Sequence, residues 1–156
     1  DAADGIRDKE NIGGEIAREL EGFKTVYEPE HAGRHPNLVN VYGIAHVPDK
    51  KGELKRAILM EAVPGPNVMK TFDALHKCFD SHKISITEYL GARQYVARCL
   101  FNVIEHMSKA DVVHNDIKPE NFLVNEKTGE PVLIDLGTWT KKGEKSDGID
   151  SKYASP

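Results

Sequence analysis

The sequence has few of the features that indicate a disulfide scaffold, a metal knuckle or a membrane span. Cysteine occurs only at Cys78 and Cys99, and this spacing excludes both a disulfide framework and a zinc knuckle. No apolar run reaches the roughly 18 residues that a membrane-spanning helix needs, and the polar N-terminus carries no secretory signal. We therefore expect a soluble protein from a reducing compartment, with both thiols buried.

An excess of one charge is also missing. The chain has 21 Lys and Arg residues against 25 Asp and Glu residues, a formal net charge of -4. A general nucleic-acid surface needs clustered Lys and Arg to displace counterions from phosphates, so we expect no nucleic-acid partner. The 156 residues, 39% of them hydrophobic, suffice for one globular domain with its own core.

Apolar periodicity predicts a helix and then a hairpin in the first half of the chain. Four apolar residues recur at helical spacing: Ile16, Leu20, Phe23 and Tyr27. The β-branched stretch 38–47 predicts a strand, and the turn-rich residues 48–53 separate it from a second strand that ends at Met60. Pro64 and Pro66 have no amide donor, so the chain must leave the sheet there.

The second half predicts two helices followed by short strands. Residues 67–78 form a short helix, and Ser85 with Glu88 makes a capping box for a long helix that ends near Lys109. Three short apolar pieces then follow, at 112–113, 122–124 and 132–134. We expect the polar stretch 138–151, rich in Gly, Lys and Ser, to be mobile.

The run HNDIKPEN, residues 114–121, carries the groups that phosphoryl transfer requires. That reaction needs a carboxylate to deprotonate a hydroxyl, a cation for the transferring group and hard oxygen ligands for Mg²⁺. Asp116 can accept the hydroxyl proton, and Lys118, on the same side of an extended loop, can neutralise the γ-phosphate of ATP. Asn121 supplies a metal-ligating oxygen, and Asp135, at the end of a β-branched strand, can bridge Mg²⁺ ions.

These residues resemble the catalytic loop and the DFG motif of eukaryotic-type serine/threonine protein kinases. Further matches follow kinase order: HPNLV at 35–39 with the segment after the kinase C helix, ILMEAVPG at 58–65 with the hinge region, and Tyr153 to Pro156 with a truncated APE motif. The resemblance implies an α+β fold, the bilobal kinase-like fold in part. It also implies three regions: 1–60 as the remainder of the N-lobe, 61–66 as the hinge and 67–156 as the upper C-lobe with the activation segment.

The same resemblance implies a nucleotide site. Met60 would be the gatekeeper, Glu61 and Val63 would offer main-chain hydrogen bonds to adenine, and Leu123 would form the floor beneath it. His114 would take a core position under the site.

Two glutamates compete for the role of the C-helix glutamate that pairs with the kinase lysine. Glu19 is favoured because Phe23 and Val26 follow it on one helix face, whereas Glu15 heads the EI pair often seen at this place.

Two positions depart from the kinase pattern. Asn115 replaces the arginine that pairs with a phosphorylated activation loop, so we expect activation by a partner, or constitutive activity. Leu136 replaces the phenylalanine of DFG and keeps an apolar side chain there. Three segments are also similar to the secreted bacterial effector kinases of the YopO/YpkA type: VVHNDIKPEN, NEKTGEPVLIDLG and HPNLVNVYG. That similarity implies delivery into a host cell cytoplasm and an activating partner such as actin.

Parts of a kinase are missing from the sequence. No glycine-rich loop or lysine-bearing strand precedes the first helix, and the later C-lobe helices do not follow. We interpret the chain as the central segment of a longer kinase that phosphorylates Ser or Thr hydroxyls of proteins, with little activity from residues 1–156 alone. Two alternatives stay open: a small-molecule kinase of the aminoglycoside type, which Lys118 disfavours, and a pseudokinase binding platform, which the complete polar set disfavours.

Overall fold

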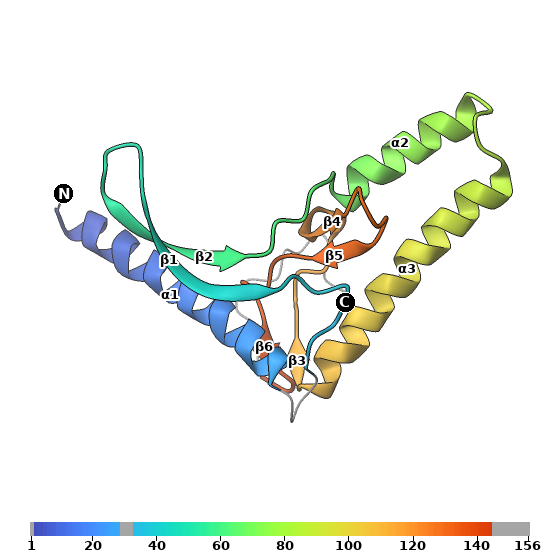
Figure 1. Cartoon of the computed structure of the whole chain (residues 1–156). Helices are drawn as coiled ribbons and strands as arrows, with labels where there is room; N and C mark the ends of the chain where they lie inside the picture. The colour runs from blue at the N-terminus through green and yellow to red at the C-terminus, as the bar shows by residue number, and fades with distance from the viewer. Residues whose placement is uncertain (1, 29–32, 145–156) are drawn as a thin grey trace.

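The computed structural model describes residues 2–28 and 33–144, with side chains of the first helix from residue 14 onward. The helices are α1 (Ala2–Tyr27), α2 (Val68–Asp80) and α3 (Ile86–Lys109). The strands are β1 (Val41–Pro48), β2 (Leu54–Met60), β3 (Val112–Val113), β4 (Phe122–Val124), β5 (Pro131–Leu133) and β6 (Thr140–Lys141). They pair as antiparallel β1–β2, β3–β6 and β4–β5. In Figure 1, α1 runs along the β1–β2 hairpin, and α2 and α3 form a second arm.

The N-terminal half agrees with the predicted helix and hairpin but not with their starts. α1 begins at Ala2, before the apolar repeat, in a segment that contains good helix formers such as Ala, Glu, Arg and Lys. β1 begins at Val41 and not at residue 38. Leu38 instead forms a bridge to Leu133, and the Val39 amide donates to the Leu133 carbonyl at 2.9 Å. Tertiary pairing with β5 therefore delays the start of β1.

Both helices predicted for the second half are confirmed, as is the capping box of the longer one. The Asn67 side chain accepts a hydrogen bond from the Lys70 amide at 3.0 Å and begins α2. Ser85 and Glu88 form both bonds of a capping box, and α3 ends at Lys109. These caps satisfy amide groups that would otherwise lack partners in the first helical turn.

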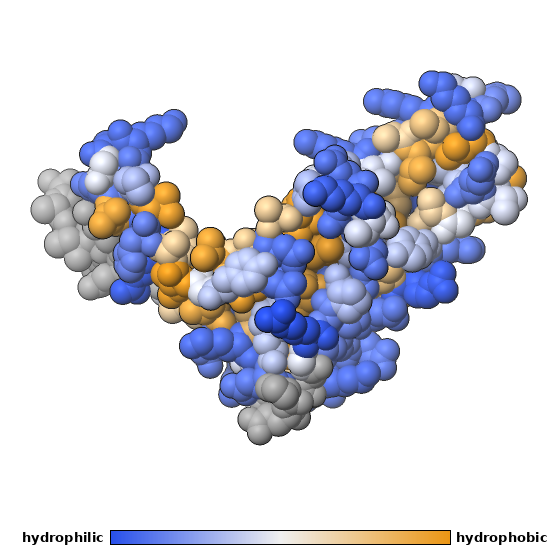
Figure 2. All heavy atoms as spheres, viewed as in Figure 1, coloured by the Kyte–Doolittle hydropathy of each residue, from blue (hydrophilic) through white to orange (hydrophobic). Residues whose placement is uncertain are grey.

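The core lies where α1, the segment before β1, the end of α3 and the β4–β5 hairpin meet. Its fully buried side chains include Phe23, Val26, Leu38, Val39, Val103, Met107, Phe122, Leu133 and Leu136. Asn37 is buried among them, and its side-chain amide donates to the Pro131 carbonyl at 2.8 Å. Apolar side chains remain exposed on the β1–β2 hairpin, among them Tyr42, Ile44 and Leu59 (Figure 2).

The prediction of a mobile stretch from residue 138 is wrong for its described part. Trp139 and Thr140 are buried, and β6 pairs with β3. A large aromatic side chain buries enough apolar surface to order the short polar segment around it. The rest of that stretch, like the predicted APE match, lies outside the described residues.

One histidine and the two cysteines differ in their burial. His106 is buried, and its Nε2 lies 2.8 Å from the Gly33 carbonyl. Cys99 is buried as expected, whereas Cys78 is half-buried. Across residues 2–28 and 33–144, no helix has the length and apolar character of a membrane span.

Candidate active site

The loop between β3 and β4 brings the two predicted catalytic residues, Asp116 and Lys118, together with the predicted metal ligand Asn121. The Lys118 Nζ lies 2.6 Å from Asp116 Oδ2, and the Asn121 Nδ2 lies 3.2 Å from the same oxygen. Asn121 also donates to the Asp116 carbonyl at 3.0 Å. A 3-10 turn at Pro119–Asn121 folds the chain back so that Asn121 can reach Asp116. Within this short loop, a cation and an amide therefore contact the same carboxylate oxygen of Asp116.

The second metal-ligand candidate, Asp135, is held next to this loop by the β4–β5 hairpin. The Ile134 amide donates to the Asn121 carbonyl at 3.0 Å, so the residue before Asp135 is bonded to the catalytic loop. Asp135 Oδ1 accepts from the Gly137 amide at 2.7 Å. Because the Asn121 amide nitrogen is directed to Asp116, its amide oxygen is the atom left to ligate a cation. Amide and carboxylate oxygens suit Mg²⁺.

Of the two competing glutamates, the structure brings Glu19 toward the site and leaves Glu15 exposed. Burial raises the pKa of the half-buried Glu19 carboxyl, and the negative charge of Asp135 raises it further. A backbone hydrogen bond from Leu136 opposes this shift. Within the part of the chain that the structure describes, Glu19 has no cationic partner. It is therefore a carboxylate placed beside another carboxylate, without the cation that would favour its charged form.

The predicted hinge follows β2 directly. Met60 pairs with Val41 at the end of the β1–β2 ladder and is half-buried. The Glu61 amide donates to the Asn40 carbonyl at 2.8 Å, so a ligand contact by Glu61 falls to its carbonyl. The Asn40 side chain in turn donates to the Glu61 carboxylate at 2.6 Å. Sequence reasoning missed Asn40, whose only signal was a polar side chain within a β-branched stretch.

Val63 and Leu123 are the two remaining residues predicted to contact the nucleotide. Val63 is half-buried and packs against the core. Leu123 is half-buried on β4, opposite Val132, and bridges to Asn67 just before α2. The predicted floor residue therefore comes from the β4–β5 hairpin, which Asn121 directly precedes and Asp135 closely follows.

His114 and Asn115 connect the loop to the chain after Asp135. His114 is buried, its Nδ1 accepts from the Asp116 amide at 3.2 Å, and burial lowers its pKa. Asn115 adopts a positive φ of 67° and donates to the Thr138 carbonyl and to Thr140 Oγ1, both at 2.9 Å. Thr138 Oγ1 donates to the His114 carbonyl at 2.8 Å. Sequence reasoning identified Asn115 as unusual but missed its partners.

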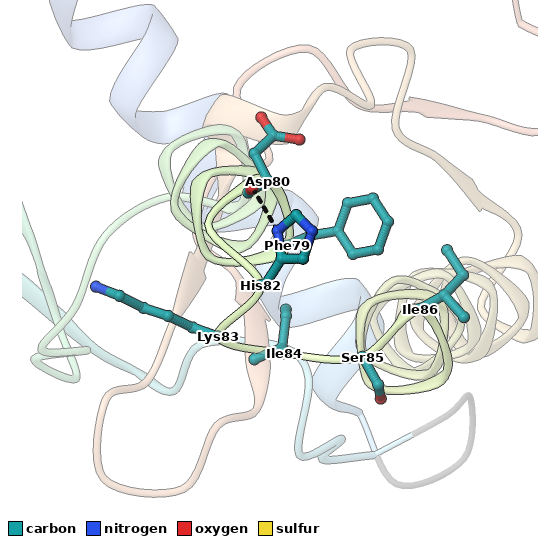
Figure 3. A pocket seen from close by; sticks show the side chains of 7 residues that line it. All are labelled: Phe79, Asp80, His82, Lys83, Ile84, Ser85 and Ile86. Atoms are coloured by element: carbon teal, nitrogen blue, oxygen red, sulfur yellow. Dashed lines mark hydrogen bonds between the residues drawn. The ribbon is translucent and has the colours of Figure 1, made fainter.

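A hollow of about 670 Å³ lies elsewhere, at the turn between α2 and α3. Figure 3 shows the side chains that line it, from Phe79 and Asp80 at the end of α2 to Ser85 and Ile86 at the start of α3. None of the predicted site residues lines it, and Figure 1 places this turn at the end of the arm away from β4 and β5. It is separate from the catalytic loop.

Comparisons with known proteins agree with this geometry. A family model for the protein kinase domain matches residues 5–156. Protein kinase YpkA from Yersinia pseudotuberculosis, and likewise from Yersinia pestis, is 40% identical over 145 residues, which are 92% of this chain and 19% of the relative. The human hormonally up-regulated neu tumor-associated kinase is 35% identical over 125 residues, 79% of this chain and 15% of the relative.

The chain spans less than a fifth of the length of these two relatives in the aligned regions. The family match, in contrast, covers nearly the whole chain. The α+β arrangement of helices and small antiparallel sheets in this chain is that of a partial kinase fold. Protein phosphorylation is the general activity of such domains, with ATP and a divalent metal as their general requirements. The chain therefore belongs to the protein kinase domain family.

Proposed function

We propose that this chain is the central segment of a serine/threonine protein kinase that transfers the γ-phosphoryl group of ATP to protein hydroxyls. The observation that carries the proposal is the Asp116 carboxylate, of which one oxygen contacts both Lys118 and Asn121. A pseudokinase platform would have no need for this complete set. A carboxylate held by two donors keeps a fixed orientation, and orientation is the main catalytic contribution in phosphoryl transfer.

Each residue has a separate role in this proposal. Asp116 accepts the proton of the substrate hydroxyl, and Lys118 stabilises the negative charge of the transferring phosphoryl group. Asn121 and Asp135 are the residues that would hold Mg²⁺, through an amide oxygen and a carboxylate. When bound, Mg²⁺ supplies charge neutralisation on the phosphates.

The nucleotide would lie between the hinge and β4. The Glu61 carbonyl and the Val63 main chain would meet the adenine edge, with Met60 as the gatekeeper and Leu123 beneath the ring. Glu19 would pair with a lysine from another part of the longer protein. The raised pKa of the Glu19 carboxyl supports this pairing, because a cation is the group that would stabilise its charge.

We further propose that residues 1–60 belong to the N-lobe, 61–66 to the hinge and 67–156 to the upper C-lobe. The similarity to Yersinia protein kinase YpkA supports an effector role, with secretion into a host cell and a host activating partner such as actin. Asn115 supports partner activation or constitutive activity, because its neutral side chain replaces the arginine that would recognise an activation-loop phosphate.

The test is Asp116→Asn in the full-length protein that carries this chain. We expect kcat for peptide phosphorylation to fall by about 10²–10⁴-fold, the typical contribution of a general base, with an unchanged melting temperature. Ser and Thr peptides should be accepted and a Tyr peptide refused. Asp111→Asn, an exposed aspartate outside the catalytic loop, is the matched control. Retention of activity in Asp116→Asn would show that Asp116 is not the base.

A further inference from the structure

Trp139, the only tryptophan of the chain, makes reciprocal hydrogen bonds with α1. Its indole Nε1 donates to the Arg18 carbonyl at 2.6 Å, and Arg18 Nη2 donates to the Trp139 carbonyl at 3.1 Å. The side chain is buried, with 7% of its surface exposed. A residue shortly after Asp135 is thus bonded in both directions to the helix that carries Glu19.

Gly22 makes this approach possible. A Cβ atom at position 22 would lie 2.6 Å from Trp139 Cδ1 and 2.8 Å from Nε1, closer than real contacts allow. Glycine is otherwise unfavourable in the interior of a helix. The indole ring therefore occupies the volume that any other residue at position 22 would fill.

The opposite side of the same segment is bonded to the catalytic loop. Asn115 donates to the Thr138 carbonyl and to Thr140 Oγ1, and Thr138 Oγ1 donates to the His114 carbonyl. β6 also pairs with β3. The residues on either side of Trp139 are fixed to the loop while Trp139 itself is fixed to α1.

Glu19 directly follows Arg18 and lies within the helical turn that ends at Gly22. A helix moves as a rigid element over so short a distance, so holding Arg18 and Gly22 also holds Glu19. The contacts of Trp139 with Arg18 and Gly22 are called the Trp139 clamp below.

We propose that Trp139 is a positioning residue: the Trp139 clamp holds α1 against the start of the activation segment, so that Glu19 faces the catalytic site without a phosphorylated loop. This inference rests on the proposed kinase function. Hydrogen bonds to backbone carbonyls and packing thereby replace the phosphate-to-arginine contact that Asn115 cannot make.

The first experiment is a double-mutant cycle in the full-length protein. Gly22→Ala alone should lower kcat/KM by about tenfold or more, as misplacement of a catalytic group does. In a Trp139→Ala background, whose activity is already reduced, Gly22→Ala should cause no further loss and should raise the melting temperature, because alanine is the better helix former. Gly14→Ala on the same helix, with nothing within 4 Å of the added Cβ, is the matched control and should leave activity unchanged.

The second experiment asks whether Trp139 acts through Glu19. Trp139→Phe keeps a ring but removes the indole donor, and it should raise KM for ATP and lower activity. In a Glu19→Gln background the same change should have little further effect. Activity of the wild-type protein should also survive phosphatase treatment.

Two results would overturn the proposal. One is an equal loss from Gly22→Ala with and without Trp139; the other is an equal loss from Trp139→Phe with and without Glu19. If Trp139→Ala does not fold, Trp139→Val serves in the first cycle, because valine also leaves no ring beside position 22. Absence of phosphoryl transfer in the wild-type protein would refute the proposed function instead. The clamp could still be tested by melting temperature, which Gly22→Ala should lower in the wild type and raise in the Trp139→Ala background.

Discussion

Replacement of Asn115 by alanine is expected to destabilise the catalytic loop through two separable effects. The side chain makes two hydrogen bonds of 2.9 Å to Thr138 and Thr140, and each such bond contributes about 0.5–1.5 kcal/mol. The backbone of Asn115 has a φ of 67°, where alanine pays roughly 1 kcal/mol more than asparagine. The contact with the Val113 carbonyl, at 3.5 Å, is too long to add to this total.

Asn115→Ala should therefore lower the free energy of unfolding by about 2–4 kcal/mol. Asn115→Gly removes the same hydrogen bonds without the backbone penalty, so it should be about 1 kcal/mol milder. Asn102→Ala, at an exposed position on α3, is the matched control and should change stability by less than about 0.5 kcal/mol.

The assay is urea unfolding of the kinase-containing protein, with the midpoints compared at constant slope. Kinase activity is measured in parallel, and kcat should fall in both Asn115 variants because the loop that carries Asp116 loses its support from residues 138–140. Equal stabilities of the alanine and glycine variants would refute the backbone argument. Stability of both within about 0.5 kcal/mol of wild type would refute the hydrogen-bond argument as well.

Two further predictions concern Glu19 and Ser85. In the 156-residue chain, Glu19→Gln should raise the melting temperature at neutral pH by about 1–3 °C. The folded-state pKa of Glu19 is raised, so the wild type loses stability as the pH rises above the ordinary glutamate range. The higher melting temperature of the variant should therefore disappear below that pH range. A difference in melting temperature that persists in acid would contradict the electrostatic cause. Ser85→Ala removes the hydroxyl that accepts from the Glu88 amide and should cost about 1 kcal/mol in urea unfolding without changing kcat, whereas Ser108→Ala, an exposed serine near the end of α3, should be nearly neutral.

Local sequence determined the elements whose stabilising contacts are close along the chain. The caps at Asn67 and Ser85 act within three residues, and α2 and α3 formed as predicted. The contacts among the proposed site residues are also local, since Asp116, Lys118 and Asn121 lie on one short loop. Motif spacing therefore sufficed to place these residues together.

Only the tertiary structure decided the features that depend on distant partners. It turned Glu19 and not Glu15 toward Asp135, and it delayed β1 because Val39 pairs with β5. It also ordered the polar stretch around Trp139, whose hydrogen-bond partner on α1, Arg18, lies 121 residues away in sequence. Sequence by itself determined the chemistry of the loop, because phosphoryl transfer selects residue types and short spacings. The setting of α1 against that loop required the fold, because a glycine and a tryptophan reveal their fit only when packing brings them together.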